Sequence, residues 1–255
     1  ISQPVANTIE TQAYAAALAQ PILLGKPLMH HVEVVAQLEG SHLEQLPELI
    51  EAATRADGHD PIGEHKFLRL QRGDDLAVAV LAYEHGKLAG YAHTVTYRDQ
   101  ERRRVSCEFV VHPEQRGIGV GRLLLAQVIE HARSQQAQRI DVWAYNDSPA
   151  SVHLAVQLGF KPVRRLLHLH RHIGETAPAA AVADARLRAF RPGEDDERWL
   201  KLNNRIFAGH PENGSWTLDD LRARMAQPWF HAEDVLMLEV DGALAGFCWL
   251  KVETR

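Results

Sequence analysis

A repeated pattern of helix, strand and turn constrains the fold of this 255-residue chain more than any other feature. The stretch YEHGKLAGYAHTV, residues 83–95, returns as LEVDGALAGFCWLKV, residues 238–252, so that Gly90 matches Gly246 156 positions later. An amphipathic helical pattern precedes each copy, GSHLEQLPELIEAATRA in the first and GEDDERWLKLNNRIFA in the second. The same elements in the same order predict two copies of one fold.

The composition along the chain predicts four segments. Residues 1–28 are rich in Ala and Gln, and we expect an N-terminal extension there, a candidate for disorder with AYAAALAQ as a candidate short helix. Residues 29–174 form the first copy, the Ala-rich residues 175–185 a linker, and residues 186–255 the N-terminal part of the second copy. The second copy reaches only its first hairpin, so we expect the sequence to stop within that repeat.

The first copy has the pattern of an α/β fold. A hairpin with the turn EHGK precedes the strand RRVSCEFVVHP, a glycine loop, and a helix at residues 120–135 whose apolar side chains share one face. The strand RIDVWAYN, a helix at residues 148–158 and the strand KPVRRLLHLHRH follow. Strands and helices in this order predict an α/β layer with a mixed sheet.

The loop HPEQRGIGVGR between strand and helix is the strongest indication of a ligand. Backbone N–H groups at the start of a helix attract anions, glycines let a phosphate approach them, and Arg116 adds a charged donor. A Walker loop would need Lys-Ser/Thr after the glycines, and a dinucleotide fingerprint would need Gly-x-Gly-x-x-Gly directly at the strand end. The pattern that fits is Arg-x-x-Gly-x-Gly, formed by Arg116, Gly119 and Gly121, beside the alternative of a glycine-rich turn without a ligand.

Two segments, VVHPEQRGIGVGRLLL and AYNDSPASVHLAVQLGF, resemble the acetyl-CoA motifs of the GNAT N-acetyltransferases. The resemblance implies that the loop amides hold the CoA pyrophosphate and that the preceding strand pairs with the pantetheine arm. It implies that Phe109, Val110 and Val111 contact the pantetheine and acetyl end. The implied pyrophosphate contacts are Gln115, Arg116, Gly117, Ile118, Gly119, Val120 and Gly121.

The segments LNNRIFAGHPENGSWT and DGHDPIGE, with the two copies, resemble a tandem branch of this family from actinobacteria over about residues 30–255. This resemblance implies acetyl transfer to the cysteinyl amine of desacetylmycothiol, a cysteine–glucosamine–inositol conjugate. It also implies acceptor contacts by Glu64, Glu212 and Lys251, whose side chains can hydrogen-bond sugar hydroxyls. Without the resemblance, Glu64 is typical of a helix cap or a solvated charge, and Lys251 of an edge strand.

Acyl transfer to an amine needs a base, an oxyanion donor and an acid for the leaving thiolate. The resemblance puts Glu108 at the base position of the first copy and Ala155 where the acid Tyr usually stands, with His153 nearby as a weak substitute. The reactive copy of the branch is the second, whose base and acid would fall beyond Arg255, so we assign no catalytic residue. The alternatives are a GNAT enzyme for another amine and a non-catalytic acetyl-CoA-binding module.

The composition disfavours several other classes. A net charge of -5 disfavours nucleic-acid binding, and no apolar run approaches the ~20 residues of a membrane span. Cys107 and Cys248 are interpreted as reduced, packed thiols, and we find no signal-peptide pattern, which predicts a cytoplasmic protein. The histidines of HLHRH have no Cys or carboxylate at ligand spacing, so we expect no metal. We expect a monomer whose substrates are acetyl-CoA and desacetylmycothiol.

Overall fold

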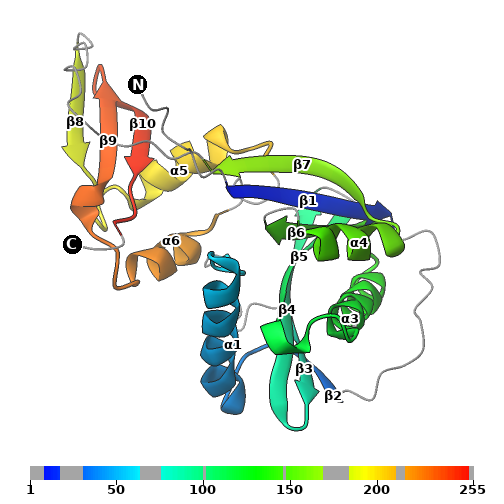
Figure 1. Ribbon diagram of the computed structural model, residues 1–255. Helices are drawn as coiled ribbons and strands as arrows, with labels where there is room; N and C mark the ends of the chain where they lie inside the picture. The colour runs from blue at the N-terminus through cyan, green and yellow to red at the C-terminus, as the bar shows by residue number, and fades with distance from the viewer. Residues whose placement is uncertain are drawn as a thin grey trace, which may run out of the picture. The chain divides into compact units, whose positions relative to one another are not determined.

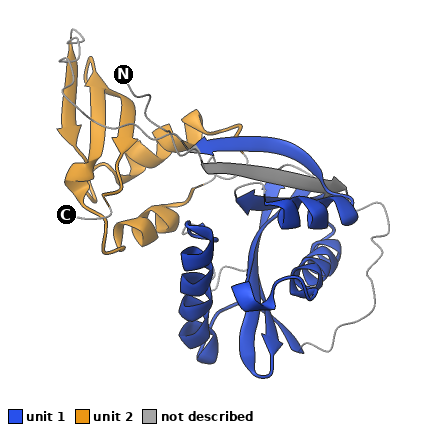
Figure 2. Ribbon diagram, viewed as in Figure 1, with its two compact units in different colours: residues 1–172 blue, residues 173–255 orange. Residues whose placement is uncertain are grey.

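The computed structural model describes residues 9–17, 31–63, 76–99, 102–145, 148–168, 184–210 and 216–252 (Figure 1). The chain divides into two compact units, residues 1–172 and residues 173–255 (Figure 2). Each unit buries its own apolar side chains. The predicted linker at residues 175–185 lies almost wholly outside the described residues.

Unit 1 is built on a seven-stranded sheet with the strand order β2-β3-β4-β5-β6-β1-β7. Among the described strands, β5 and β6 are parallel and the other neighbours are antiparallel. The predicted mixed α/β fold is therefore confirmed. The strands are β1 (Ile9–Ala17), β2 (His31–Val35), β3 (Ala77–Glu84), β4 (Lys87–Asp99), β5 (Arg102–Val111), β6 (Arg139–Tyr145) and β7 (Lys161–His168).

Helices cover both faces of this sheet, as Figure 1 shows. On one face, α1 (Ser41–Asp57) buries Leu46, Leu49 and Ala53. On the other face, α3 (Val120–Ser134) and α4 (Pro149–Gln157) bury a second set of apolar side chains. Successive side chains of a strand point to opposite faces, so in β5 Val110 packs on the α1 side and Cys107 on the α3 side.

Strand β1 corrects the expectation for the N-terminal segment. The stretch AYAAALAQ was a candidate for a short helix, but its residues 13–17 belong to the strand Ile9–Ala17, which lies between β6 and β7. A helix of this length is marginal on its own, whereas the strand finds backbone partners in both β6 and β7, so the helix was the wrong candidate for these residues. Residues 1–8 and 18–28 lie outside the described residues.

Unit 2 has a three-stranded antiparallel sheet in the order β10-β9-β8 and two helices. Its core consists of Phe190, Trp199, Leu221, Val235 and Met237, with further aromatic side chains packed around Trp199. Helix α6 begins with a capping box between Thr217 and Asp220. The elements are β8 (Ala185–Ala189), α5 (Asp196–Ile206), α6 (Leu218–Met225), β9 (Val235–Val240) and β10 (Ala243–Trp249).

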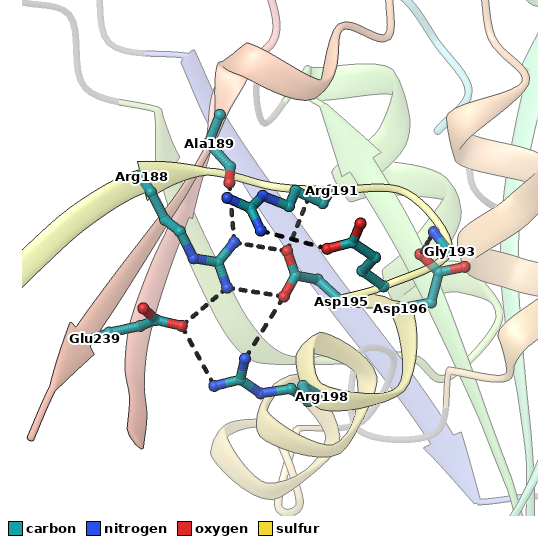
Figure 3. Close-up of polar contacts among 9 residues, drawn as sticks. Arg188, Ala189, Arg191, Gly193, Asp195, Asp196, Arg198 and Glu239 are labelled. Atoms are coloured by element: carbon teal, nitrogen blue, oxygen red, sulfur yellow. Dashed lines mark hydrogen bonds and ion pairs between the residues drawn. The ribbon is translucent and has the colours of Figure 1, made fainter. Parts of the chain in front are cut away.

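A network of charged side chains joins β8, α5 and β9 within unit 2 (Figure 3). Arg188 donates to both carboxylate oxygens of Asp195, at 2.6 and 2.8 Å, and to Glu239 at 2.9 Å. Asp195 also accepts the backbone N–H of Arg191 at 2.9 Å, and its side chain is only 3% exposed. The hydrogen bonds from Arg188 hold the pKa of Asp195 below its usual value. The network fixes the start of α5 against the sheet.

The two cysteines differ in exposure. Cys107 in β5 is buried, as expected, but Cys248 in β10 is exposed, so the expectation of a packed thiol was wrong for Cys248. Side chains alternate along β10, and Cys248 falls on the face opposite Phe247 and Trp249, which pack on the core of unit 2. Within the described residues, no helix is long and apolar enough to cross a membrane.

Candidate functional site

The parallel strands β5 and β6 separate at their carboxyl ends. Their pairing runs from Arg104–Arg139 to Cys107–Val142, although β5 continues to Val111 and β6 to Tyr145. Within the described residues, β5 beyond Cys107 pairs only with β4, and β6 pairs with β1. The strands therefore form a wedge that is open toward the glycine loop.

This wedge is part of a cavity of about 720 Å³. Its walls come from the ends of β5 and β6, the glycine loop, the first turn of α3, α4, and the last turn of α1 with the residues after it. The elements that meet here are distant in sequence and are brought together by the sheet. Sequence-predicted residues that line the cavity are Phe109, Val110, Val111, Arg116, Gly117, Gly119, Gly121, His153 and Ala155.

The backbone of β5 presents hydrogen-bonding groups to the wedge. The N–H of His112 donates to Ala89 at 2.9 Å, on the β4 side. Because the main-chain groups of a strand alternate in direction, those of Phe109 and Val111 face the side of β6 instead. The carbonyl of Val111 accepts from Nε of Arg116 at 3.2 Å. The Phe109 groups and the Val111 N–H are therefore placed to pair with an extended ligand.

The three loop glycines have different structural roles. Gly117 and Gly119 have φ of 80° and 103°, in the region that favours glycine, and together they turn the chain into α3. Gly119 is the N-cap of α3 and offers no side chain to cap the first amides, so these amides remain available to an anion. Gly121 has an ordinary φ, but a Cβ there would lie 3.3 Å from Leu154 and 3.5 Å from Phe109. Its role is close packing of α3.

Arg116 lies at the cavity but already has a partner. Its Nη1 and Nη2 donate to the two carboxylate oxygens of Asp57, both at 2.8 Å. The sequence predicted Arg116 as a phosphate donor and gave no indication of Asp57. A second arginine of the loop, Arg122, also lines the cavity and donates to Gln157. Arg122 was missed, although its place in the first turn of a helix after a glycine loop was a usable signal.

Two aromatic side chains at the cavity were also missed. The rings of His59 and Tyr145 stack with centroids 5.0 Å apart and an interplanar angle of 26°. His59 follows α1 and Tyr145 ends β6, so no local sequence pattern connects them.

On the α4 wall, Ala155 is buried and lines the cavity. It occupies the position where the resemblance puts the acid Tyr of other family members.

Glu108 lies in a buried polar cluster on the α1 side of the sheet. Its carboxylate accepts the backbone N–H of Gly63 at 2.6 Å and lies 3.4 Å from Nε2 of His93, its cross-strand neighbour. A Cβ at Gly63 would approach Glu108 to 3.2 Å, so glycine allows this contact. Burial, and then the charge of Glu108, raises the pKa of nearby Tyr91 above its usual range. A role of Glu108 as base stays a prediction.

The described structure does not bring the three predicted acceptor contacts together. Glu64 and Glu212 lie outside the described residues. Lys251, in unit 2, is exposed, and its Nζ lies 5.1 Å from the ring centre of Trp229. In the loop, the side chain of Val120 is buried in the core and that of Ile118 is 48% exposed, so Val120 can offer a ligand only its backbone.

Comparison with known proteins identifies the family. The Acetyltransferase (GNAT) family matches residues 24–160. A mycothiol acetyltransferase of Kineococcus radiotolerans is 41% identical over 85% of this chain and 71% of that protein. One of Thermomonospora curvata is 42% identical over 84% of this chain and 70% of that protein.

A solved structure agrees on the fold. A GCN5-related N-acetyltransferase from Sphaerobacter thermophilus matches with a TM-score of 0.54 and 21% sequence identity, covering 89% of this chain and 73% of that one. The wedge, the glycine loop and the sequence relatives lead to the same assignment. The chain belongs to the GNAT acetyltransferase family and, within it, to the mycothiol acetyltransferases.

Proposed function

We propose that unit 1 binds acetyl-CoA in the cavity between β5 and β6. GNAT enzymes use acetyl-CoA as acetyl donor. The observation that carries the proposal is that the strand wedge and the uncapped amides of α3 open into the same cavity. The pyrophosphate would lie on the amides of residues 117–121, which suit an anion, with Arg116 beside it. The pantetheine arm would pair with the exposed backbone of Phe109 and Val111.

The reaction in this proposal is acetyl transfer to the cysteinyl amine of desacetylmycothiol, in line with the names of the relatives. The amine nitrogen attacks the thioester carbonyl, an amide bond forms, the C–S bond breaks, and the thiolate of CoA leaves. The amine loses a proton and the thiolate gains one. An α-amine has a pKa of about 7.7–8.0, so a base needs to give only modest help near neutral pH.

The proposal assigns different tasks to the parts of the chain. Residues 29–174 hold acetyl-CoA, and residues 186–255 begin a second copy of the fold, joined by the linker at 175–185 and preceded by the extension at 1–28. Glu64, Glu212 and Lys251 contact the acceptor, as the resemblance implies. The substrates are small molecules, and we expect a cytoplasmic monomer without a metal, a nucleic-acid partner or a membrane partner.

One observation favours a second candidate function for unit 1. Ala155 lines the cavity where a Tyr acid would be expected, and alanine cannot protonate a leaving thiolate. Unit 1 would then bind acetyl-CoA without carrying out the transfer.

Calorimetry and mass spectrometry separate these alternatives. We expect acetyl-CoA to bind, and acetyl-pantetheine, which lacks the pyrophosphate, to bind at least about tenfold more weakly, because charge-assisted bonds are lost. Transfer is then measured by the mass of the product with desacetylmycothiol and with glucosamine as acceptors. Binding without any transfer supports the module, and equal transfer to both amines contradicts the proposed acceptor. Absence of acetyl-CoA binding contradicts the proposal entirely.

A further inference from the structure

The last turn of α1 contacts the glycine loop through one ion pair. Asp57 and Arg116 are 59 positions apart, and their carboxylate and guanidinium meet in a two-point contact with both distances 2.8 Å. Both residues line the cavity of unit 1. The side chain of Asp57 is 28% exposed and that of Arg116 is 42% exposed, so the pair lies at the rim, where a ligand can reach it.

A carboxylate at this place is electrostatically unfavourable in two ways. Asp57 is the last residue of α1, and the carboxyl end of a helix carries partial negative charge. Its charge would also repel an anion bound at the amides of α3, because Asp57 and the loop glycines line the same cavity. Arg116 compensates both effects. Asp57 is therefore better explained by what it does to Arg116 than by its own charge.

The segment that carries Asp57 is fixed at several points. Gly58, with φ of 77°, ends α1 and donates its N–H to Thr54 at 2.8 Å. Further on, the N–H of Gly63 donates to buried Glu108 at 2.6 Å. Between them, His59 stacks on Tyr145. These contacts hold Asp57 in place, so that it can orient a more flexible side chain.

We propose that Asp57 is a positioning residue that holds Arg116 ready for the phosphate groups of acetyl-CoA. Three of the five N–H groups of Arg116 are engaged by Asp57 and by the Val111 carbonyl, which fixes the plane of the guanidinium. Within the described residues, two N–H groups remain to donate to the ligand. This inference rests on the proposed function of unit 1 and adds a residue outside the glycine loop.

The substitution Asp57→Asn tests the sign of the effect. Removal of a negative charge beside an anion site should tighten acetyl-CoA binding if Asp57 acts only through its charge. Loss of the two-point contact should weaken binding about tenfold if Asp57 positions Arg116. Calorimetry measures both cases. Glu51→Gln is the matched control, because it removes an exposed carboxylate from the same helix, and we expect it to leave binding unchanged.

Acetyl-pantetheine separates positioning from a general loss of structure. It has no pyrophosphate, so we expect its affinity for Asp57→Asn and for the unchanged chain to agree within about twofold. Equal weakening of both ligands, or tighter binding of acetyl-CoA, overturns the inference. If the unchanged chain does not bind acetyl-CoA, the proposed function itself fails, which is a different outcome.

A second variant protects the test against misfolding of the first. Arg116→Lys keeps the positive charge but cannot make the planar two-point contact with Asp57. We expect acetyl-CoA to bind this variant about as weakly as Asp57→Asn, and the double variant to be no weaker than Arg116→Lys alone. Wild-type affinity in Arg116→Lys, or fully additive losses in the double variant, would contradict the inference.

Discussion

The hairpins β3–β4 and β9–β10 have the same local geometry in different surroundings. Their turns have nearly equal φ angles, 49° and 79° at His85 and Gly86, and 51° and 74° at Asp241 and Gly242. The pairing register shifts at the same place in both, so that Leu88 and Gly90 correspond to Leu244 and Gly246. Local sequence therefore determines turn and bulge in each unit.

The matching glycines differ in what packs on them. A Cβ at Gly90 would lie 2.9 Å from both Leu124 and Val120 of α3, whereas at Gly246 the nearest atoms, in Leu238, are 4.0 Å away. Unit 1 has apolar clusters on both faces of its sheet, and the described part of unit 2 has one cluster and a charged network. One sequence pattern thus forms a hairpin twice, while tertiary packing decides which of its residues are critical.

The largest expected effect concerns the charged network of unit 2. Arg188→Met leaves the carboxylate of Asp195 buried without its main partner, and we expect a loss of about 3 kcal/mol in the free energy of unfolding. Urea unfolding followed by tryptophan fluorescence measures it, because Trp199, Trp216, Trp229 and Trp249 all lie in unit 2. The control is Arg191→Met, whose exposed pair with Glu194 should be worth less than about 1 kcal/mol. Equal losses would contradict a special role for Arg188.

The second effect separates the two matched glycines. Gly90→Ala forces its Cβ against α3, and we expect unit 1 to lose about 1–3 kcal/mol. Gly246→Ala meets only ordinary contacts, so unit 2 should change by less than about 0.5 kcal/mol. Hydrogen exchange measured peptide by peptide reports each unit separately. A loss at Gly246 as large as at Gly90 would show that the surroundings of the two hairpins do not differ in the way described.

A smaller effect should be shared by both units. Gly86→Ala and Gly242→Ala each place an alanine at a left-handed turn position, with an expected loss of about 1–2 kcal/mol in its own unit. The same exchange experiment measures both. Losses that differ by more than about 1 kcal/mol would indicate that the turns are less alike than their φ angles.

The smallest effect is a pH dependence of unit 2. The pKa of Asp195 is lowered in the folded state by its hydrogen bonds from Arg188. A lowered carboxyl pKa contributes stability above the unfolded value of about 3.9, and this stability is lost as the pH falls through the folded value. We therefore expect unit 2 to weaken below about pH 4, and Arg188→Met to show a flatter profile. If the stability of Arg188→Met falls with pH as steeply as that of the unchanged chain, the hydrogen bonds from Arg188 are not the origin of the pH dependence.

Much of the fold followed from local sequence. The turn EHGK, the strand β5, the amphipathic face of α3 and the glycine loop were predicted and are confirmed. Strand β1 could not be predicted in this way. Its sequence is Ala-rich, and its partners β6 and β7 lie more than 100 residues further along the chain, so only tertiary pairing determines its structure.

Only the part of the site that local sequence encodes was predicted. The loop and the end of β5 are contiguous in sequence and carry a recognisable pattern, whereas Asp57 and His59 reach the cavity from the end of α1 and Tyr145 from the end of β6. The partnership of Arg116 with Asp57 spans 59 positions and has no local signal. The sequence pattern also does not distinguish the three glycines, although only Gly121 is needed because Leu154 and Phe109 leave little room for a Cβ.

Hydrogen exchange of the unchanged chain with and without acetyl-CoA shows whether unit 1 is the acetyl-CoA site, because it reports on both units at once. We expect the ligand to slow exchange in residues 109–122, which cover the end of β5, the glycine loop and the start of α3, and to leave exchange in β9 and β10 unchanged. Slowed exchange in unit 2 without any change in residues 109–122 would contradict the claim that unit 1 is the acetyl-CoA site.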